Sequence, residues 1–326
     1  MSNPIARSIE AALAALASRE TLTNIFFVAC GGSFAQMHLP KYALDREAKT
    51  LVADAYNSAE FIARDMPRLG ANSLVVLCSQ SGNTPETVAA ARFAKERGAY
   101  TIGLTVKPES PLAGVVDSTV GYEFLPTASS ADVAGAVLLS LAFGVLAQRE
   151  GTDRVAALDA ALAQLPAVVA GAAEAHAPEV LRWAAGAKRE PVIYTMASGP
   201  NHGISYAFAI CILQEMQWIH SQGIHAGEYF HGPFEITDFD TPIILLMGTG
   251  PSRGMDERAL AFARKFSGRV LTLDVEALDT AGMEPAMLEY LQPLIFQPLL
   301  RGYAIRLADE RGHPLTVRRY MWRMEY

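Results

Sequence analysis

Apolar runs alternate with segments of helical period along the chain from residue 24 onward. The runs are continuous rather than alternating, which is typical of parallel strands that are covered on both faces. Helices that connect such strands lie on the two faces of one sheet. The pattern therefore predicts an α/β fold with doubly wound parallel sheets. The first five strands are expected at 24–32, 49–56, 73–82, 100–108 and 118–126.

Helical patterns fill the intervals between these strands. The first 20 residues predict an amphipathic helix rather than a signal peptide, because they carry charges and lack a continuous apolar run. The helix after the first strand is expected to be interrupted near Pro40. A long apolar helix at 132–150 closes the first unit, and the Ala- and Leu-rich stretch 151–190 predicts two further helices.

The same α/β unit occurs twice in the chain. "VIYTMASGPNHG" repeats "IFFVACGGSFA", and "IILLMGTGPSRGMDERALAFAR" repeats "LVVLCSQSGNTPETVAAARFAK" at equal length. Self-similarity over such a distance indicates two copies of one supersecondary unit. The first copy carries "SQSGNT" where the second carries "GTGPSR", so we expect one copy to keep a ligand loop that the other has lost. The expected organisation is an N-terminal helix at 1–20, a first domain at 21–150, a helical connector at 151–187, a second domain at 188–308 and a tail at 309–326.

Charge and cysteine content exclude several classes of protein. The formal net charge of −7 and the absence of a basic run argue against a nucleic-acid partner. Cys30, Cys78 and Cys211 cannot all pair and lie in apolar segments, so they are expected to be reduced in a cytoplasmic protein. No segment is expected to cross a membrane.

The loop after the third predicted strand is dense in small polar groups. A loop between a parallel strand and a helix presents free N–H groups and the positive end of the helix dipole, a combination that binds anions. Without a Gly-Lys-Ser/Thr or G-x-G-x-x-G motif, a single phosphate monoester fits this loop better than a nucleotide. The alternative is that Thr84 only caps the helix, with Pro85 at its first position; this explains two residues of the loop and not the others. The candidate anion-binding side chains are Ser79, Gln80, Ser81 and Thr84.

A strand that ends in "SQSGNT", in a chain that also carries "ACGGS" after its first strand, resembles the sugar isomerase (SIS) domain of phosphosugar enzymes. The resemblance implies two repeated SIS domains, each a flavodoxin-like, doubly wound parallel sheet flanked by helices. It implies that the loop at 79–84 holds a sugar phosphate and that no metal or other cofactor is needed. It also adds Ser33 to the phosphate-binding residues and places Gly32 and Ser130 beside the sugar.

A second candidate region is "FAICILQEMQWIHSQGIHAGEYFHGP". On a helix, Glu215 shares an apolar face with Phe208, Cys211, Ile212, Trp218 and Ile219, and burial there raises the pKa of a carboxyl group towards that of a useful acid or base. The alternative is a buried, structural Glu215 paired with an arginine or a backbone donor. His225, Glu228 and His231 lack the H-E-x-x-H spacing, so a metal site is not expected.

The region is similar to the isomerase domain of glucosamine-6-phosphate synthase. The resemblance implies that Glu215 is the acid–base residue and that His231 opens the sugar ring. Glu228 would be a supporting residue. The resemblance further implies a homodimer in which His231 reaches the neighbour's site, with a tetramer possible.

Two departures point to a subgroup. The synthase-type enzymes carry a lysine where this chain has Ile212, and a lysine in the tail, whereas no lysine follows Lys265 here. The chain resembles instead the fructosamine-6-phosphate deglycases, including their "RRYMW" ending. The implied reaction converts a 6-phosphofructosyl-amine to glucose 6-phosphate and a free amine.

Other functions remain open from the sequence. A glucosamine-6-phosphate deaminase or an aldose–ketose isomerase would use similar residues, and a non-catalytic sugar-phosphate sensor would leave Glu215 and His231 without a role. Arg318, Arg319 and Arg323 of the tail could cover the site, meet an amino acid's carboxylate or form a dimer contact.

Overall fold

The structure is a computed structural model and describes residues 1–325. The chain forms two compact units, which we describe separately. The first contains residues 1–125 and 129–165, and the second contains residues 126–128 and those from 166 onward.

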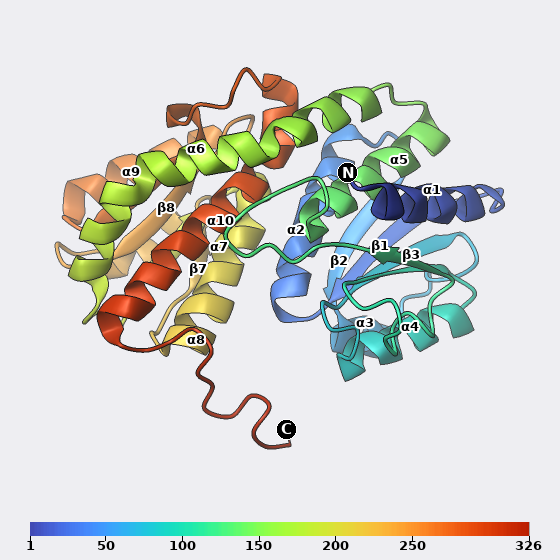
Figure 1. Ribbon diagram of the computed structural model, residues 1–326, viewed down its shortest axis with the longest axis horizontal. Coiled ribbons are helices and arrows are strands. Elements are labelled where there is room, and N and C mark those ends of the chain that lie inside the picture. The colour runs from blue at the N-terminus through green and yellow to red at the C-terminus, as the bar shows by residue number, and fades with distance from the viewer. Residues whose placement is uncertain (326) are drawn as a thin grey trace. The chain divides into compact units, whose positions relative to one another are not determined.

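The first unit is built on a five-stranded parallel sheet with the strand order β2-β1-β3-β4-β5 (Figure 1). This is the flavodoxin-type order, in which the chain reverses direction across the sheet between β1 and β3. The predicted doubly wound α/β fold is therefore confirmed. The strands are β1 (Asn24–Ala29), β2 (Val52–Asn57), β3 (Ser73–Cys78), β4 (Tyr100–Thr105) and β5 (Ser118–Gly121). The helices are α1 (Asn3–Ala17), α2 (Gly31–Glu47), α3 (Ser58–Arg64), α4 (Pro85–Glu96) and α5 (Ala134–Glu150).

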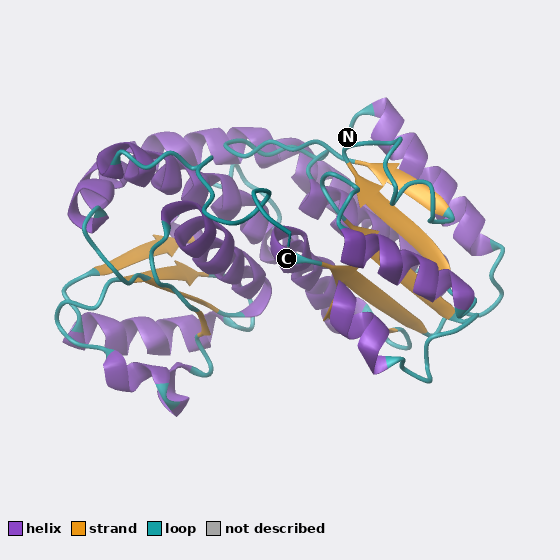
Figure 2. Cartoon of the chain, turned by 90° about the horizontal axis from the view of Figure 1, so that it is seen from below, coloured by secondary structure: helices purple, strands orange, loops and turns teal. Residues whose placement is uncertain are grey.

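Two apolar cores lie on opposite faces of this sheet because alternate strand residues point to opposite sides. Ile25 and Phe27 join one core with residues of α1, α2 and α5. Phe26 and Val28 join the other with residues of α3 and α4. All six residues of β1, β3 and β4 are buried, as expected for strands covered on both faces (Figure 2).

The second unit repeats the topology with four parallel strands in the order β7-β6-β8-β9. Its strands are β6 (Tyr194–Ala197), β7 (Gly223–His225), β8 (Ile243–Met247) and β9 (Val270–Asp274). Its α-helices are α7 (His202–Ala207), α8 (Glu215–Gln217), α9 (Arg253–Phe266) and α10 (Pro285–Arg311). Its other helical segments are η1 (Gly199–Asn201), the π-helix η2 (Phe208–Gln214), η3 (Tyr229–His231), η4 (Pro233–Ile236) and η5 (Val275–Ala277).

Two predictions about helices were wrong. The helix α2 runs through Pro40 without a break. Its neighbours Met37, Leu39 and Ala43 are buried, and this packing stabilises the helix despite one lost hydrogen bond. The stretch after α5 is a single 33-residue helix, α6 (Val155–Ala187), although it contains Pro166 and Pro178.

The length and composition of α6 also contradict the expectation that no segment could cross a membrane. The helix is long and apolar enough to span a bilayer, and part of its apolar stretch is buried within the protein. Within the second unit, His176 of α6 hydrogen-bonds the hydroxyl of Tyr303 at 3.0 Å, and Trp183 packs edge-on against the same ring. Through these contacts, α6 packs against the helix that carries Tyr303, Pro285–Arg311.

Candidate functional site

The loops after β1 and β3 lie side by side at the carboxyl edge of the first sheet. The strands are paired in register, with Ala29 opposite Cys78, so Cys30 and Ser79 begin neighbouring loops. Each loop leads into the first turn of a helix, α2 or α4. Because the strand order reverses between these two strands, the loops form the crevice in which open α/β sheets bind ligands.

The hydroxyl groups of Ser79 and Thr84 hold the loop in shape. Their oxygen atoms are 2.8 Å apart, and the Ser79 hydroxyl also accepts the Gly82 N–H at 3.1 Å. Thr84 occupies the N-cap position of α4, and Pro85 follows, but the Thr84 side chain makes no capping bond to the helix. The simple capping alternative is therefore wrong for the side chain of Thr84, and the N–H groups of the first turn keep their capacity for a ligand.

Gly82 fixes the path of the loop. Its φ of +67° lies in the left-handed region, and a Cβ built on it would be 2.0 Å from Oγ of Ser110. The residues on either side, Ser81 and Asn83, are exposed, and the Asn83 N–H donates to the Ser81 hydroxyl at 3.2 Å. Gln80 is also exposed, while its carbonyl accepts the Val106 N–H at 3.3 Å. The loop thus presents hydroxyl and amide groups from a backbone that β4 and the segment after it support.

The other candidate residues differ in their positions. Gly32 and Ser33 lie in the first turn of α2 at the same crevice, and the Ser33 hydroxyl bonds the thiol of Cys78. Ser130 precedes the helix that the sequence predicts at 132–150, and the helix observed there, α5, begins only at Ala134. The Ser130 hydroxyl accepts the Asp132 N–H at 3.0 Å, so this serine belongs to a turn beyond the edge strand β5.

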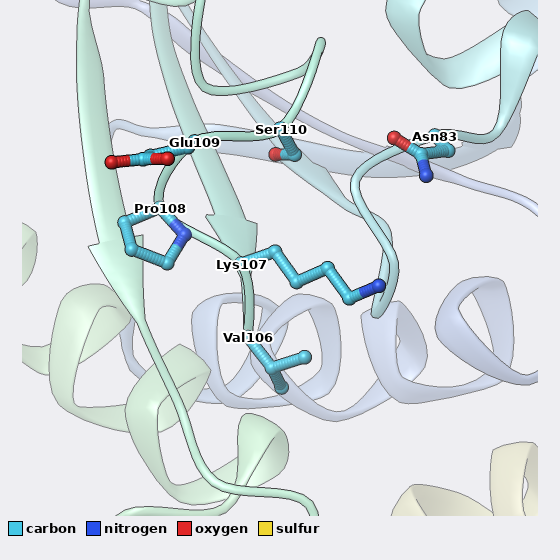
Figure 3. Close-up of a pocket in the computed structure, with 6 residues that line it drawn as sticks. All are labelled: Asn83, Val106, Lys107, Pro108, Glu109 and Ser110. Atoms are coloured by element: carbon cyan, nitrogen blue, oxygen red, sulfur yellow. The ribbon is translucent and has the colours of Figure 1, made fainter.

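Lys107 is a residue that the sequence interpretation missed. It follows β4 and lines an open cavity of about 440 Å³ together with Asn83 of the loop and Ser110 (Figure 3). The side chain extends towards the segment that carries Asn83 in Figure 3. Because the carboxyl ends of parallel strands meet at one edge, the lysine at the end of "YTIGLTVK" was the available signal for a cation beside this loop.

In the second unit, the loop that corresponds to residues 79–84 is bonded by a carboxylate of the protein itself, that of Asp256. Asp256 in the first turn of α9 is fully buried and stands where the first copy has Thr87. It accepts hydrogen bonds from the Ser198 hydroxyl at 2.6 Å and from the Gly248 N–H at 3.1 Å. Burial raises the pKa of Asp256, and these bonds oppose the rise. A loop whose N–H already bonds a side-chain anion has less capacity for a phosphate than the loop at Ser79.

The segment that carries Glu215 is not the regular α-helix that the sequence predicted. Residues Phe208–Gln214 form a π-helix, and Trp218 ends the helix with a φ of +55°. The i→i+5 hydrogen bonds of a π-helix change the directions in which its side chains point, compared with an α-helix. Leu213 and Gln217 are buried as a result, whereas Trp218 is exposed. The expected apolar face therefore does not include Trp218. π-Helical turns occur frequently at functional sites.

Glu215 lies partly buried and pairs with Arg318 of the tail. Its Oε1 is 2.7 Å from a guanidinium nitrogen of Arg318, and the side chain of Glu215 is 22% exposed. Burial raises the pKa of Glu215, and the charge and hydrogen bond of Arg318 oppose that rise. The upward shift of the pKa agrees with the prediction, and the arginine partner is one that the structural alternative named, so the carboxyl group is partly desolvated and lies beside a cation.

The tail packs along the end of this helical segment. Gln217 donates to the carbonyl of His313 at 2.7 Å, and the Trp218 ring packs edge-on against the His313 ring at 4.5 Å. The guanidinium group of Arg319 stacks on the same Trp218 ring, 4.3 Å from the ring centre. These contacts accompany the ion pair of Arg318 with Glu215.

His231 lies at the end of η3 with its side chain exposed. No ring hydrogen bond from His231 to another of residues 1–325 is present, and Glu228 is likewise exposed. His225 accepts the Gly227 N–H at 3.1 Å, which accounts for one of its nitrogens. In the described part of the chain, no three His, Cys, Asp or Glu side chains are grouped closely enough to hold a metal ion.

Comparisons with known proteins agree with this architecture. The SIS domain profile matches residues 3–139. The chain is 46% identical to the fructosamine deglycase FrlB of Bacillus subtilis (strain 168), over 98% of this chain and 97% of that protein. It is 26% identical to the fructoselysine 6-phosphate deglycase of Escherichia coli (strain K12), over 93% of this chain and 86% of that one. A crystal structure from Bacillus subtilis, described as that of a phosphosugar isomerase, superimposes with a TM-score of 0.96 at 46% identity and covers both chains completely.

A doubly wound parallel sheet with a polar loop where its strand order reverses defines an α/β protein of the ligand-binding kind. With the profile match and the full-length relatives, the chain belongs to the SIS-domain family.

Proposed function

We propose that this protein is a fructosamine-6-phosphate deglycase, which cleaves a 6-phosphofructosyl-amine to glucose 6-phosphate and a free amine. The observation that carries the proposal is the 46% identity to a fructosamine deglycase over nearly the whole of both chains. The site residues are consistent with it, because Glu215 and His231 are present whereas the lysines of the synthase-type enzymes are absent.

The phosphate group of the substrate binds at the loop 79–84. Ser79 and Thr84 shape the loop, and Ser81, Gln80 and the free N–H groups of α4 donate hydrogen bonds to the phosphate oxygens. Ser33 and Gly32 add the first turn of α2 on the other side of the crevice. Lys107 contributes a positive charge, which favours the dianion of a phosphate monoester.

Proton transfers then convert the sugar. His231 moves a proton to open the furanose ring, and the carboxylate of Glu215 removes the proton from C1, next to the C2 carbonyl. The resulting enolamine is reprotonated at C2, which leaves an imine at C1. Water adds to C1, and the amine leaves. Burial raises the pKa of Glu215, and an upward shift favours a group that both accepts and returns a proton.

The enzyme acts as a hydrolase in the cytoplasm and as a homodimer. Free thiols at Cys30, Cys78 and Cys211 fit a reducing compartment. The exposed ring of His231, which contacts no described partner through its nitrogens, is suited to reach a second copy of the chain. Ser130 is the weakest of the proposed sugar contacts because its hydroxyl already accepts a backbone N–H.

A coupled assay for glucose 6-phosphate tests the proposal. The panel contains 6-phosphofructosyl adducts of several amino acids, with glucosamine 6-phosphate and fructose 6-phosphate alongside. Turnover of a fructosyl adduct is expected. Ammonia release from glucosamine 6-phosphate alone would make the protein a deaminase, and turnover of fructose 6-phosphate alone would make it an isomerase. Tight phosphosugar binding without any turnover would contradict an enzymatic role.

A further inference from the structure

Positive charge gathers around Glu215 in excess of what this carboxylate can neutralise. Arg318 pairs with Glu215, Arg319 stacks on Trp218, and Arg301 of α10 contacts the sulfur of Met216 at 3.5 Å. Among the described residues, Glu215 is the one carboxylate in an ion pair with any of these three arginines. The excess is local, because the chain as a whole carries a net charge of −7.

Arg301 is the cation without an anion. It is partly buried, forms no ion pair with any of residues 1–325, and lies within electrostatic range of a second guanidinium, that of Arg318. Burial lowers the pKa of Arg301, and the charge of Arg318 lowers it further. The Nε atoms of Arg301 and Arg318 are both buried, and neither meets an acceptor in the described part of the chain. The terminal nitrogens of Arg318 already bond Glu215 and the carbonyls of Leu315 and Val317, so Arg301 is the partly desolvated cation that still lacks an anion among the described residues. A desolvated cation is unfavourable until an anion pairs with it, which suits Arg301 to an anionic ligand.

We propose that Arg301 and Arg318 form a subsite for a carboxylate on the amine half of the substrate, which we call the carboxylate subsite. The proposal rests on the proposed function. In a 6-phosphofructosyl-amino acid, the amine nitrogen is bonded to C1, the carbon from which Glu215 removes a proton. The carboxylate carbon of an α-amino acid then lies roughly 4 Å from C1, since three bonds of about 1.5 Å separate them. Arg318 contacts Glu215 and Arg301 contacts the adjacent Met216, so a carboxylate subsite formed by the two arginines would lie on the C1 side of the substrate. Guanidinium groups bind carboxylates with two parallel hydrogen bonds.

Two substrates that differ only in the carboxylate test the proposal. 6-Phosphofructosyl-glycine and 6-phosphofructosyl-glycinamide share the sugar, the phosphate and the secondary amine. For each substrate, we measure kcat and KM, and calorimetry gives the Kd independently of turnover. The unaltered enzyme is expected to prefer the glycine adduct by about 10-fold to 100-fold, the range for a charge-assisted hydrogen bond. Arg301→Gln should remove most of this preference through KM, and Arg301→Lys should retain part of it.

Arg306→Gln is the matched control. Arg306 lies on the same helix and is also partly buried, but it pairs with Glu310. This variant should keep the preference for the glycine adduct, and the thermal midpoint of each variant shows whether it folds.

Three results would overturn the carboxylate subsite. Equal kcat/KM and Kd for the two adducts with the unaltered enzyme would do so while leaving the deglycase function intact. A loss of affinity in Arg301→Gln that is the same for both adducts would assign Arg301 to another part of the substrate. A change of oligomeric state in Arg301→Gln, with the preference unchanged, would instead pair Arg301 with an acidic residue of a second copy. If neither adduct is turned over, the proposed function fails, and the calorimetric preference decides on the carboxylate subsite alone.

Discussion

Glu215 is held between two opposing influences at the scale of a single residue. Partial burial favours the protonated carboxyl group, and the guanidinium of Arg318 favours the carboxylate. A buried ion pair of this kind is weak evidence for stability, because desolvation offsets the Coulombic gain. The effect of the ion pair that matters here is on the pKa of Glu215, which Arg318 lowers.

Replacement of Glu215 by Gln should abolish proton transfer but not binding. The amide keeps the size of the side chain and a hydrogen-bond acceptor for Arg318, but it cannot accept a proton from C1. We expect kcat to fall by about 10²-fold to 10⁴-fold, the usual contribution of one acid–base group. The Kd for a non-reactive phosphosugar, measured by calorimetry, should change little. The exposed Glu235 in the same unit provides the control, since Glu235→Gln should leave both quantities unchanged. Near-normal turnover by Glu215→Gln would remove the assigned role.

The acidic limb of the pH profile should depend on Arg318. In the proposed mechanism, turnover requires the carboxylate of Glu215, so kcat/KM falls as the pH drops through the pKa of Glu215. Because Arg318 lowers this pKa, Arg318→Gln leaves the raising effect of burial unopposed and shifts the fall to higher pH. The glycinamide adduct is the suitable substrate, because it has no carboxylate for Arg318 to bind.

Arg319→Gln is the control for this shift. Arg319 is adjacent in sequence but stacks on Trp218 rather than pairing with Glu215. The acidic limb of the pH profile of Arg319→Gln should coincide with that of the unaltered enzyme. If Arg318→Gln leaves the limb in place, or moves it to lower pH, Arg318 does not set the pKa of Glu215.

At the scale of an element, the loop between β3 and α4 depends on its glycine. Gly82→Ala places a methyl group 2.0 Å from the Ser110 hydroxyl oxygen and in a left-handed conformation. We expect a loss of about 2–4 kcal/mol in the free energy of unfolding, from roughly 1–2 kcal/mol of backbone strain and a similar cost of displacing Ser110. The affinity for phosphosugars should fall as well, because the N–H groups of the loop change direction. Chemical denaturation and calorimetry measure the two effects.

Gly98, which follows α4, provides a control that separates backbone strain from the clash with Ser110. Its φ of +83° is also left-handed, but the nearest atom to a built Cβ is 3.7 Å away. Gly98→Ala should therefore show only the backbone strain and should bind phosphosugars normally. An equal loss of stability in the two variants, with binding intact in both, would show that the contact with Ser110 is unimportant.

The elements show which properties the sequence determines locally. The strands and the loop at Ser79 follow from continuous apolar runs and from side chains close together in the chain, and both were predictable. The path of α2 through Pro40 and the single helix α6 were not, because tertiary packing decides whether a proline interrupts a helix. The π-helix before Glu215 shifts the apolar face by an amount that a periodicity of 3.6 residues cannot reveal.

The candidate site divides in the same way. Ser79, Thr84 and Glu215 carry local signals in sequence, but their partners do not. Arg318 reaches Glu215 only because the tail folds back on the second unit, and Lys107 joins the loop at Ser79 only because β4 is the neighbour of β3. Such contacts between distant parts of the chain require the topology as well as the residue types.

At the scale of the whole molecule, the proposed dimer makes the active site a property of two chains. If His231 serves the partner's site, Glu215→Gln and His231→Ala damage different halves of one shared site. Each variant alone should be inactive, because symmetry repeats its defect in both sites. A heterodimer of the two variants contains one site with both residues intact and one site with neither.

Mixing the two inactive variants should therefore restore activity. Co-expression or subunit exchange at equal amounts gives about one quarter of the intact sites of the unaltered enzyme, since about half of the dimers are heterodimers and each holds one complete site. The deglycase assay on 6-phosphofructosyl-glycine measures the recovery, and sedimentation confirms that dimers are present. A mixture of two Glu215→Gln preparations is the control and should remain inactive. If heterodimers form without any recovered turnover, Glu215 and His231 of the same chain act together, and the dimer has another purpose.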